Sequence, residues 1–450
     1  MAARTQPARG MRDFLPVDVR RRQYVIDVVR RTYERYGFEP LETPALENIE
    51  TLTGKYGEEG NKLIFKVLRR GEHESSGETD LALRYDLTVP LARVVAEHRA
   101  QLPKFFRRYQ IQPVWRADRP ARGRFREFYQ CDVDAIGSTS PLVEVELCAA
   151  VTDVLRELGF ADFTLRMNHR AVLSGLLHAA GIDASRHGDA LVAIDKMDKI
   201  GRDGVVREFE NRQIAAACAE RLLDAFTAGG TNDATLARLR AAVTDDAGRA
   251  GVENLAAIVS LASPTSAGPA IRIDPSLARG LSYYTGAIME IAVADLAGSL
   301  GGGGRYDGLI GMFSGEQIPA CGFSLGLERI LVVMAERAMF PASADAAGPD
   351  VLVTVFEDRD AARTAEARRQ SLALATDLRK AGLRVELYPE ADKLGKQFKY
   401  AAAREATFAA VLGGDEIARG EVTLKRLATG DQESVPRADV AARIRSAASR

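Results

Sequence analysis

Residues 124–134 read RFREFYQCDVD, and their side chains alternate with a period of two, which indicates a β-strand. One face is mainly apolar and is expected to pack; it holds Phe125, Glu127, Tyr129, Cys131 and Val133. The other face has basic residues at one end and acidic residues at the other; it holds Arg124, Arg126, Phe128, Gln130, Asp132 and Asp134. Such a polar face suits the floor of a binding site.

A second strand is predicted at 105–116, and the loop ADRPARG joins the two strands into a hairpin. Arg116 and Asp118 have the same parity and can share a face, as can Arg124 and Phe128. Arginine binds phosphate through paired hydrogen bonds and charge, and a phenylalanine offers a stacking plane for a flat heterocycle. The hairpin therefore favours a triphosphate and a base at one end, and an amine or imidazole at the other. The alternative is a strand that lines a salt-bridge network between domains.

Positive charge is concentrated in this hairpin, although the chain as a whole has a net charge of −1. Eight basic residues lie between Lys104 and Arg126, and Asp118 is the only acid among them. A basic run is usually a solvated face; its place between two strands makes a site for a polyanion about as plausible, so both interpretations stay open.

The composition is that of a globular protein of two to four domains, with 450 residues, 46% hydrophobic and 27% charged. No apolar run approaches the roughly 20 residues of a membrane span. The four cysteines form no CxxC and the five histidines are scattered, so we expect no metal site, no disulfides and a cytoplasmic location. The basic N-terminus could be a transit peptide, but it has no apolar stretch and is expected to be a tail.

Other elements follow from hydrophobic periodicity. A helix is predicted at 18–36, a helix of about 18 residues near Pro141, and strands at 81–89, 124–136 and around 270–292. On the strand at 81–89, Asp86 and Thr88 would share a face. Residues 165–260 are expected to be mostly helical and to form an insertion.

A glycine run, GSLGGGGRYDGLIGMF at 298–313, allows two interpretations. Four consecutive glycines let a backbone approach a ligand closely, or they form a flexible hairpin loop. The following stretch, GFSLGLERILVVMAER, is predicted to be a short strand that continues into a helix.

Residues 341–350 are small and contain proline and glycine, which is typical of a linker. Beyond them strands and helices alternate, with helices near 360–382 and 393–405, and this pattern predicts an α/β domain with a largely parallel sheet. The chain has no P-loop, and no GxGxxG opens a helix after a strand, which argues against hydride transfer.

Three stretches resemble the motifs of class II aminoacyl-tRNA synthetases, in the order typical of that class. YGFEPLETP, ending at Pro44, resembles motif 1, which builds the dimer interface in this class. Arg116, Asp118, Arg124 and Phe128 match motif 2, and GFSLGLERI resembles motif 3, with Arg329 at the start of its helix.

Further stretches narrow the resemblance to histidyl-tRNA synthetases: LRYDLTVPLAR (83–93), FREFYQCDVDAIG (125–137), and RGLSYYTG (279–286), which resembles the histidine-binding motif of that family. KLGKQFKYA and ARGEVTLKRL resemble its anticodon-binding domain. The implied architecture is an α+β catalytic domain with a mainly antiparallel sheet at 1–340, a helical insertion at about 170–260, a linker at 341–350 and an anticodon-binding α/β domain at 351–450.

The resemblance also implies roles for individual residues. Those implied to bind histidine are Asp86, Thr88, Arg116, Gln130, Asp134, Arg279, Tyr283 and Tyr284. Those implied to bind ATP are Arg116, Asp118, Arg124, Phe128 and Arg329, and Mg²⁺ is expected to accompany ATP. Arg116 and Arg279 are implied to be catalytic, because fixed cations stabilise the charge of phosphoryl transfer. Ser282 departs from the more familiar motif, which has aspartate there, so no role of an acid is expected at that position.

The implied activity is activation of histidine to histidyl-adenylate with ATP and transfer to the 3′ end of tRNA(His), in a homodimer that does not contact a membrane. One alternative is a catalytically inactive paralogue that regulates histidine biosynthesis; such paralogues usually lack the C-terminal domain and catalytic motif residues, which this chain has. Another is a class II synthetase for threonine, proline or glycine, and the stretch RGLSYYTG argues against it.

Overall fold

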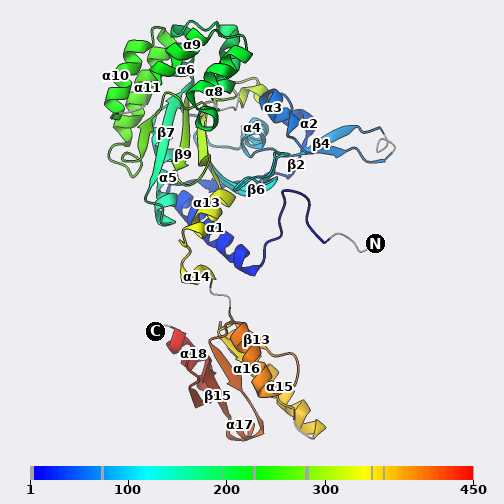
Figure 1. Cartoon of the computed structure of the whole chain (residues 1–450). Helices are drawn as coiled ribbons and strands as arrows, with labels where there is room; N and C mark the ends of the chain where they lie inside the picture. The colour runs from blue at the N-terminus through cyan, green and yellow to red at the C-terminus, as the bar shows by residue number, and fades with distance from the viewer. Residues whose placement is uncertain are drawn as a thin grey trace. The chain divides into compact units, whose positions relative to one another are not determined.

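A computed structural model describes residues 5–71, 76–194, 196–226, 230–278, 283–345, 348–357 and 360–448. The chain divides into two compact units, Met1–Phe340 and Pro341–Arg450 (Figure 1). No helix in these described ranges is long and apolar enough to cross a membrane.

Unit 1 is built on an eight-stranded sheet. Its strands, in spatial order, are β1 (Glu39–Pro40), β5 (Phe106–Trp115), β6 (Glu127–Ile136), β11 (Ala320–Gly326), β10 (Ser299–Arg305), β9 (Ala287–Val293), β7 (Phe163–His169) and β8 (Ile271–Ile273). Only the outermost pairs, β1 with β5 and β7 with β8, are parallel. The five inner pairs are antiparallel, so the predicted mainly antiparallel sheet is confirmed.

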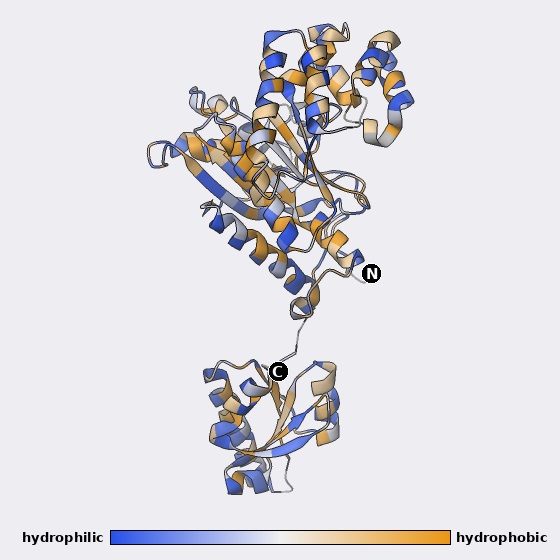
Figure 2. Cartoon of the chain, turned by 90° about the vertical axis from the view of Figure 1, so that its left-hand side faces the viewer, coloured by the Kyte–Doolittle hydropathy of each residue, from blue (hydrophilic) through white to orange (hydrophobic). Residues whose placement is uncertain are grey.

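Helices α1 (Pro16–Arg35), α5 (Leu142–Glu157) and α13 (Leu327–Glu336) pack against this sheet. Val25, Val28 and Val29 recur at helical spacing and are buried, which gives α1 its inward face. The helix begins at a proline, whose fixed φ suits the first turn, and Gly37 follows its end with a φ of 74°. Figure 2 shows hydrophobic and hydrophilic residues on different sides of such helices.

The predicted strand at 81–89 is wrong in its second half. Strand β4 (Thr79–Leu83) ends early, and helix α4 (Thr88–Glu97) begins at Thr88. Pro90 lies in the first turn of α4, where its missing N–H costs nothing, and Asp86 Oδ1 accepts a hydrogen bond from the backbone N–H of Val89 at 3.0 Å. Asp86 and Thr88 therefore do not alternate along a strand; they lie in a turn and at a helix start.

Strand β4 is the centre of a small three-stranded sheet with β2 (Leu46–Asn48) and β3 (Lys66–Leu68). Two short helices, α2 (Ile49–Leu52) and α3 (Gly57–Lys62), connect β2 to β3.

The glycine run forms strand β10 inside the large sheet, so the hairpin-loop interpretation is wrong. A Cβ atom on Gly301 would lie 2.4 Å from the carbonyl oxygen of Ser324, and one on Gly303 would lie 2.1 Å from that of Gly322. Both distances are far below van der Waals contact. The glycines are therefore required by the close approach of β11, and helix α12 (Gly311–Ser314) follows.

The stretch predicted to be mostly helical begins with β7 and then contains six α-helices in its described part, grouped together in Figure 1. They are α6 (Arg170–Ala179), α7 (His187–Ile194), α8 (Met197–Asn211), α9 (Ala216–Ala225), α10 (Asn232–Ala242) and α11 (Asp246–Ala262).

Unit 2 holds a five-stranded sheet of β13 (Val385–Leu387), β12 (Val351–Val353), β14 (Phe408–Val411), β15 (Glu421–Arg426) and β16 (Gln432–Pro436). Its helices are α15 (Ala361–Lys380), α16 (Leu394–Ala403), α17 (Gly414–Arg419) and α18 (Val440–Ala448), and α14 (Ala342–Asp345) precedes them. Only two of the four strand pairs are parallel. The predicted largely parallel sheet is wrong because β15 and β16 add an antiparallel hairpin.

Candidate active site

A pocket of about 290 Å³ lies over β6, β10 and β11 of the large sheet. Ten of the predicted site residues line it: Asp86, Thr88, Arg116, Asp118, Arg124, Phe128, Gln130, Tyr283, Tyr284 and Arg329. They come from five separate stretches of unit 1, so the fold brings together residues that are far apart in the sequence.

The predicted ATP end of the pocket is built on the β5–β6 hairpin. Arg116 Nε donates to the carbonyl oxygen of Tyr85 at 3.0 Å, and its guanidinium lies 4.2 Å and 5.2 Å from the ring centroids of Tyr85 and Phe128. These contacts fix the cation beside an aromatic face. Strand β6 begins only at Glu127, so Arg124 lies in the exposed loop and lines the pocket without sharing a strand face with Phe128.

Two further residues of the hairpin region contribute to this end. Arg126, which had no predicted role, donates from Nε to the carbonyl oxygen of Asp118 at 3.0 Å and so holds the loop closed. Phe125 was assigned to the packing face but lines the pocket, and the Arg12 guanidinium lies 3.4 Å from its ring centroid.

Helix α13 supplies Arg329 and Glu328 at its first turn. Arg329 Nη1 donates to the carbonyl oxygen of Ser299 at the start of β10. Glu328 is buried; it accepts from Arg22 at 2.7 Å and from the backbone N–H of Tyr129 at 2.9 Å. Strand β11 pairs with β6 only as far as Gln130, so Glu328 satisfies the next backbone donor of β6.

The predicted histidine end centres on the buried carboxylate of Asp86. It accepts from Tyr56 Oη at 3.1 Å and from Tyr283 Oη at 3.3 Å, in addition to the Val89 N–H. Burial raises the pKa of Asp86, and these hydrogen bonds and the charge of Arg116 act against that rise. Tyr284 lies beside Tyr283, with ring centroids 5.0 Å apart. Sequence reasoning missed Tyr56.

Gln130 lies between the two ends and leaves one acceptor unused. Its Nε2 donates to Ser324 Oγ at 2.7 Å and to Asp132 Oδ1 at 3.4 Å. Its Oε1 is buried and has no hydrogen-bond partner within the described part of the chain. A buried acceptor in this state is costly, so it is suited to a donor on a ligand.

Asp134 is not among the residues that line the pocket. Its carboxylate is buried next to Gly322 of β11, pairs with Arg108 at 2.8 Å and accepts from Tyr306 Oη. Neighbouring Asp132 is also buried and lies 3.8 Å from Arg108. The pKa of Asp132 is raised to about 7, mainly by burial and also by the charge of Asp134, while Arg108 acts in the opposite direction.

A chain of hydrogen bonds continues from Arg108 along β5 to Gln112, which lies opposite Gln130. Arg108 Nη1 donates to Gln110 Oε1 at 3.1 Å, and Gln110 Nε2 donates to Gln112 Oε1 at 2.6 Å. Arg84 donates to Gln112 Oε1 at 3.0 Å and to the carbonyl oxygen of Thr43 at 2.6 Å. The floor of the pocket is thereby connected to the stretch that resembles motif 1.

Arg279 and Ser282 lie outside the described residues. Among the residues that are described, no group of three or more His, Cys, Asp or Glu side chains could hold a metal ion.

Comparison with known proteins identifies the family. The model of the family "Histidyl-tRNA synthetase" matches residues 10–330, and that of the "Anticodon binding domain" matches residues 350–447. The chain belongs to the histidyl-tRNA synthetase family. It is 44% identical to the histidine–tRNA ligase of Porphyromonas gingivalis, over 95% of this chain and 96% of that protein. It is also 44% identical to the histidine–tRNA ligase of Gloeobacter violaceus, over 97% and 98%.

Solved structures of this family have the same fold. The crystal structure of histidyl-tRNA synthetase from Nostoc sp. PCC 7120 superimposes with a TM-score of 0.80 and 31% sequence identity, over 99% of this chain and 100% of that one. The apo structure from S. aureus, at 22% identity and a TM-score of 0.68, supports the fold alone. The class II fold expected for this family is therefore confirmed.

Proposed function

We propose that the pocket in unit 1 carries out ATP-dependent ligation of histidine to tRNA(His). The enzyme is an aminoacyl-tRNA ligase, as are the histidine–tRNA ligases it matches over nearly their full length. The assignment of the site rests on one observation: three arginines, Arg116, Arg124 and Arg329, line the same pocket as the hydrogen-bonded carboxylate of Asp86. Its basic and acidic ends match a substrate pair of a polyphosphate and an amino acid.

In the first step, a carboxylate oxygen of histidine attacks the α-phosphorus of ATP, and diphosphate leaves with the electrons of the broken bond. Two negative groups must approach each other, so fixed cations stabilise the transition state. We assign this role to Arg116, whose guanidinium is held by the Tyr85 carbonyl, and to Arg279 on the basis of the motif. Arg124 and Arg329 bind the outer phosphates, Phe128 stacks on adenine, and Asp118 lies beside the nucleotide.

In the second step, a hydroxyl of the terminal ribose of the tRNA attacks the histidyl carbonyl carbon, and AMP leaves. Mg²⁺ enters with ATP as part of that substrate. Mg²⁺ commonly binds through phosphate oxygens with few protein ligands, which is compatible with a pocket whose carboxylates include Asp118 and Glu328.

Histidine is recognised in this proposal by three groups. The Asp86 carboxylate and Thr88 bind the α-ammonium group, and the unused Oε1 of Gln130 accepts one further N–H of the amino acid. Tyr283 and Tyr284 form the wall beside the imidazole. Asp134 orients Tyr306 and Arg108, and its direct contact with histidine stays a prediction. A site built for a polar ring rejects analogues that leave its polar groups unpaired.

Unit 2 is proposed to bind the anticodon of the tRNA, with residues 341–350 as the linker, and the motif 1 stretch is proposed to form a homodimer. We propose the cytoplasm as the location, since the four cysteines are free and three of them are buried.

Histidine-dependent exchange of labelled pyrophosphate into ATP tests the proposal, measured with each of the twenty amino acids. Exchange with histidine alone is expected. Exchange with a different amino acid, and none with histidine, would contradict it. Absence of exchange with every amino acid, in a folded protein, would instead favour an inactive paralogue.

A further inference from the structure

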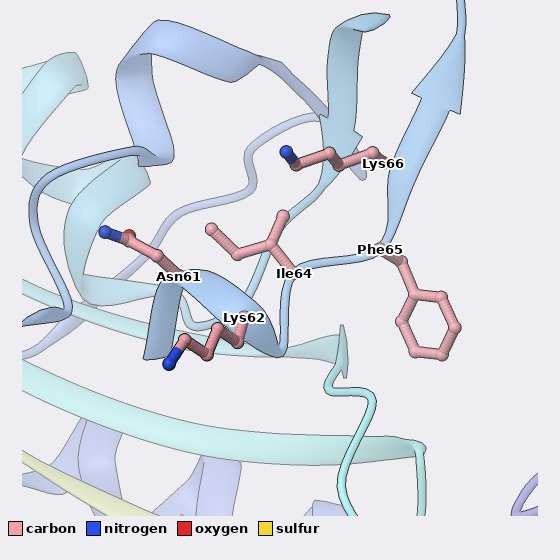
Figure 3. A pocket seen from close by; sticks show the side chains of 5 residues that line it. All are labelled: Asn61, Lys62, Ile64, Phe65 and Lys66. Carbon is pink, nitrogen blue, oxygen red and sulfur yellow. The ribbon is translucent and has the colours of Figure 1, made fainter. Parts of the chain in front are cut away.

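A second pocket, of about 650 Å³, lies beside the active site and is lined by Asn61, Lys62, Ile64, Phe65 and Lys66. It is formed where α3 ends and β3 begins. In Figure 3, the Lys66 amino group lies above Ile64, the Lys62 amino group lies below it and the Asn61 amide lies to one side, while the Phe65 ring points away.

The polar groups of this pocket are hydrogen-bond donors. Asn61 Oδ1 accepts from the backbone N–H of Gly54 at 3.3 Å, which leaves its NH₂ group directed outward. Both lysines are exposed. Two ammonium groups and an amide NH₂ around one hollow favour phosphate groups as ligands.

The pocket is attached directly to the loop that holds the reacting end of ATP. The backbone N–H of Ala117 donates to the carbonyl oxygen of Leu63 at 2.9 Å. Ala117 stands between Arg116 and Asp118, which both line the active site. A strand of nucleic acid whose last ribose reaches Arg116 therefore places its preceding phosphates within reach of this pocket.

We infer that the Lys62–Lys66 pocket binds backbone phosphates of the single-stranded 3′ end of the tRNA and guides its terminal ribose to the adenylate. This inference rests on the proposed ligase function and adds a contact surface to it. The lysines act in the second step only, because they do not line the pocket that binds ATP and histidine.

The test separates the two steps with the variant Lys62→Gln/Lys66→Gln in the full chain. Pyrophosphate exchange without tRNA is expected to stay within about twofold of wild type. Charging of tRNA(His), as kcat/KM, is measured from 50 to 200 mM KCl. Each phosphate contact to a single strand contributes about 0.7 to the steepness of log affinity against log salt concentration. Loss of two contacts therefore makes the slope shallower by about 1.4. The fall in kcat/KM between 50 and 200 mM KCl is then about sevenfold smaller in the variant than in wild type. The single variant Lys66→Gln is expected to lower the slope by about 0.7.

Lys104→Gln is the matched control, because Lys104 is also exposed but lies at the opposite end of β5, roughly 34 Å away along the strand. Its slope is expected to equal that of wild type. An unchanged salt slope in the double variant overturns the inference, and so does an equal change of slope in the Lys104→Gln control. Loss of pyrophosphate exchange in the double variant alone, or a change in its oligomeric state, also overturns it. Absence of histidine-dependent pyrophosphate exchange in the wild-type protein overturns the proposed function instead.

Discussion

Replacement of Tyr56 by phenylalanine tests whether Asp86 binds the α-ammonium group of histidine. The tyrosine hydroxyl donates to the buried Asp86 carboxylate at 3.1 Å and does not line the pocket, so the substitution removes one hydrogen bond and leaves the shape of the site unchanged. A hydrogen bond to a charged group contributes about 1.5–3 kcal/mol. If that energy holds the carboxylate ionised and oriented, the KM for histidine rises roughly ten- to hundredfold, since about 1.4 kcal/mol is a factor of ten.

The Tyr56→Phe variant is also expected to change the pH dependence of histidine activation in one direction. Burial raises the pKa of Asp86, and the hydrogen bond from Tyr56 lowers it. Removing that bond raises the pKa further, and only the ionised carboxylate attracts an ammonium group. The acidic limb of kcat/KM for histidine, measured by pyrophosphate exchange, is therefore expected to move to higher pH, while the KM for ATP stays near wild type.

Tyr36→Phe is a matched control, because Tyr36 Oη also donates to a carboxylate, that of Asp153 at 2.7 Å, outside the pocket. It is expected to leave both the KM for histidine and the acidic limb unchanged. A wild-type KM and an unmoved limb in Tyr56→Phe would refute the role of Asp86 in binding the ammonium group.

Three further substitutions have defined outcomes. Arg279→Ala is expected to lower the rate of pyrophosphate exchange about 10²–10³-fold, the effect of losing one fixed electrostatic group, and an exchange rate near wild type would exclude its catalytic role. Phe128→Ala is expected to raise the KM for ATP by about tenfold, because base stacking on an aromatic ring contributes about 1–3 kcal/mol, with the KM for histidine as the internal control. Gly301→Ala places a Cβ atom 2.4 Å from the Ser324 carbonyl and is expected to reduce the free energy of unfolding by about 1–3 kcal/mol in chemical denaturation; an unchanged value would show that β10 and β11 can separate.

Local signals in the sequence predicted the hairpin end of the pocket, whereas Asp86, Thr88, Tyr283, Tyr284 and Arg329 were implied by the family resemblance. The alternation along residues 124–134 and the spacing of Arg116, Arg124 and Phe128 lie within one hairpin, and the structure places these three residues in one pocket. The turn at Asp86 was misread as strand because Leu83–Val89 is apolar at several positions, and the period alone does not show that a helix starts at Thr88.

Residues that act through long-range contacts could not be found in this way. Tyr56 meets Asp86 across 30 residues, and Glu328 meets Arg22 across 306. Neither contact leaves a periodic pattern in the sequence, although the acid beside Arg329 in GFSLGLERI was a usable signal for Glu328. The glycines of β10 could not be explained from the sequence either, because they are required by the close approach of β11, which occurs only in the folded sheet.

The negative charge at the acidic end of β6 is compensated by an arginine of the neighbouring strand β5. Asp132 and Asp134 are both buried and share one arginine, Arg108, which lies 2.8 Å from Asp134 and 3.8 Å from Asp132. Burial raises the pKa of both carboxyl groups, that of Asp132 to about 7, so one proton held by the pair brings this group of three close to neutral. The fixed negative charge at the surface of the histidine end then comes from Asp86, while Asp134 serves to orient Tyr306 and Arg108. The opposite charges read along β6 therefore have different surroundings: Arg124 lines the pocket from the loop before β6, whereas Asp132 and Asp134 lie buried further along the strand face of Gln130 and are compensated by Arg108 of β5. Gln130 is left to present an uncharged acceptor to the amino acid.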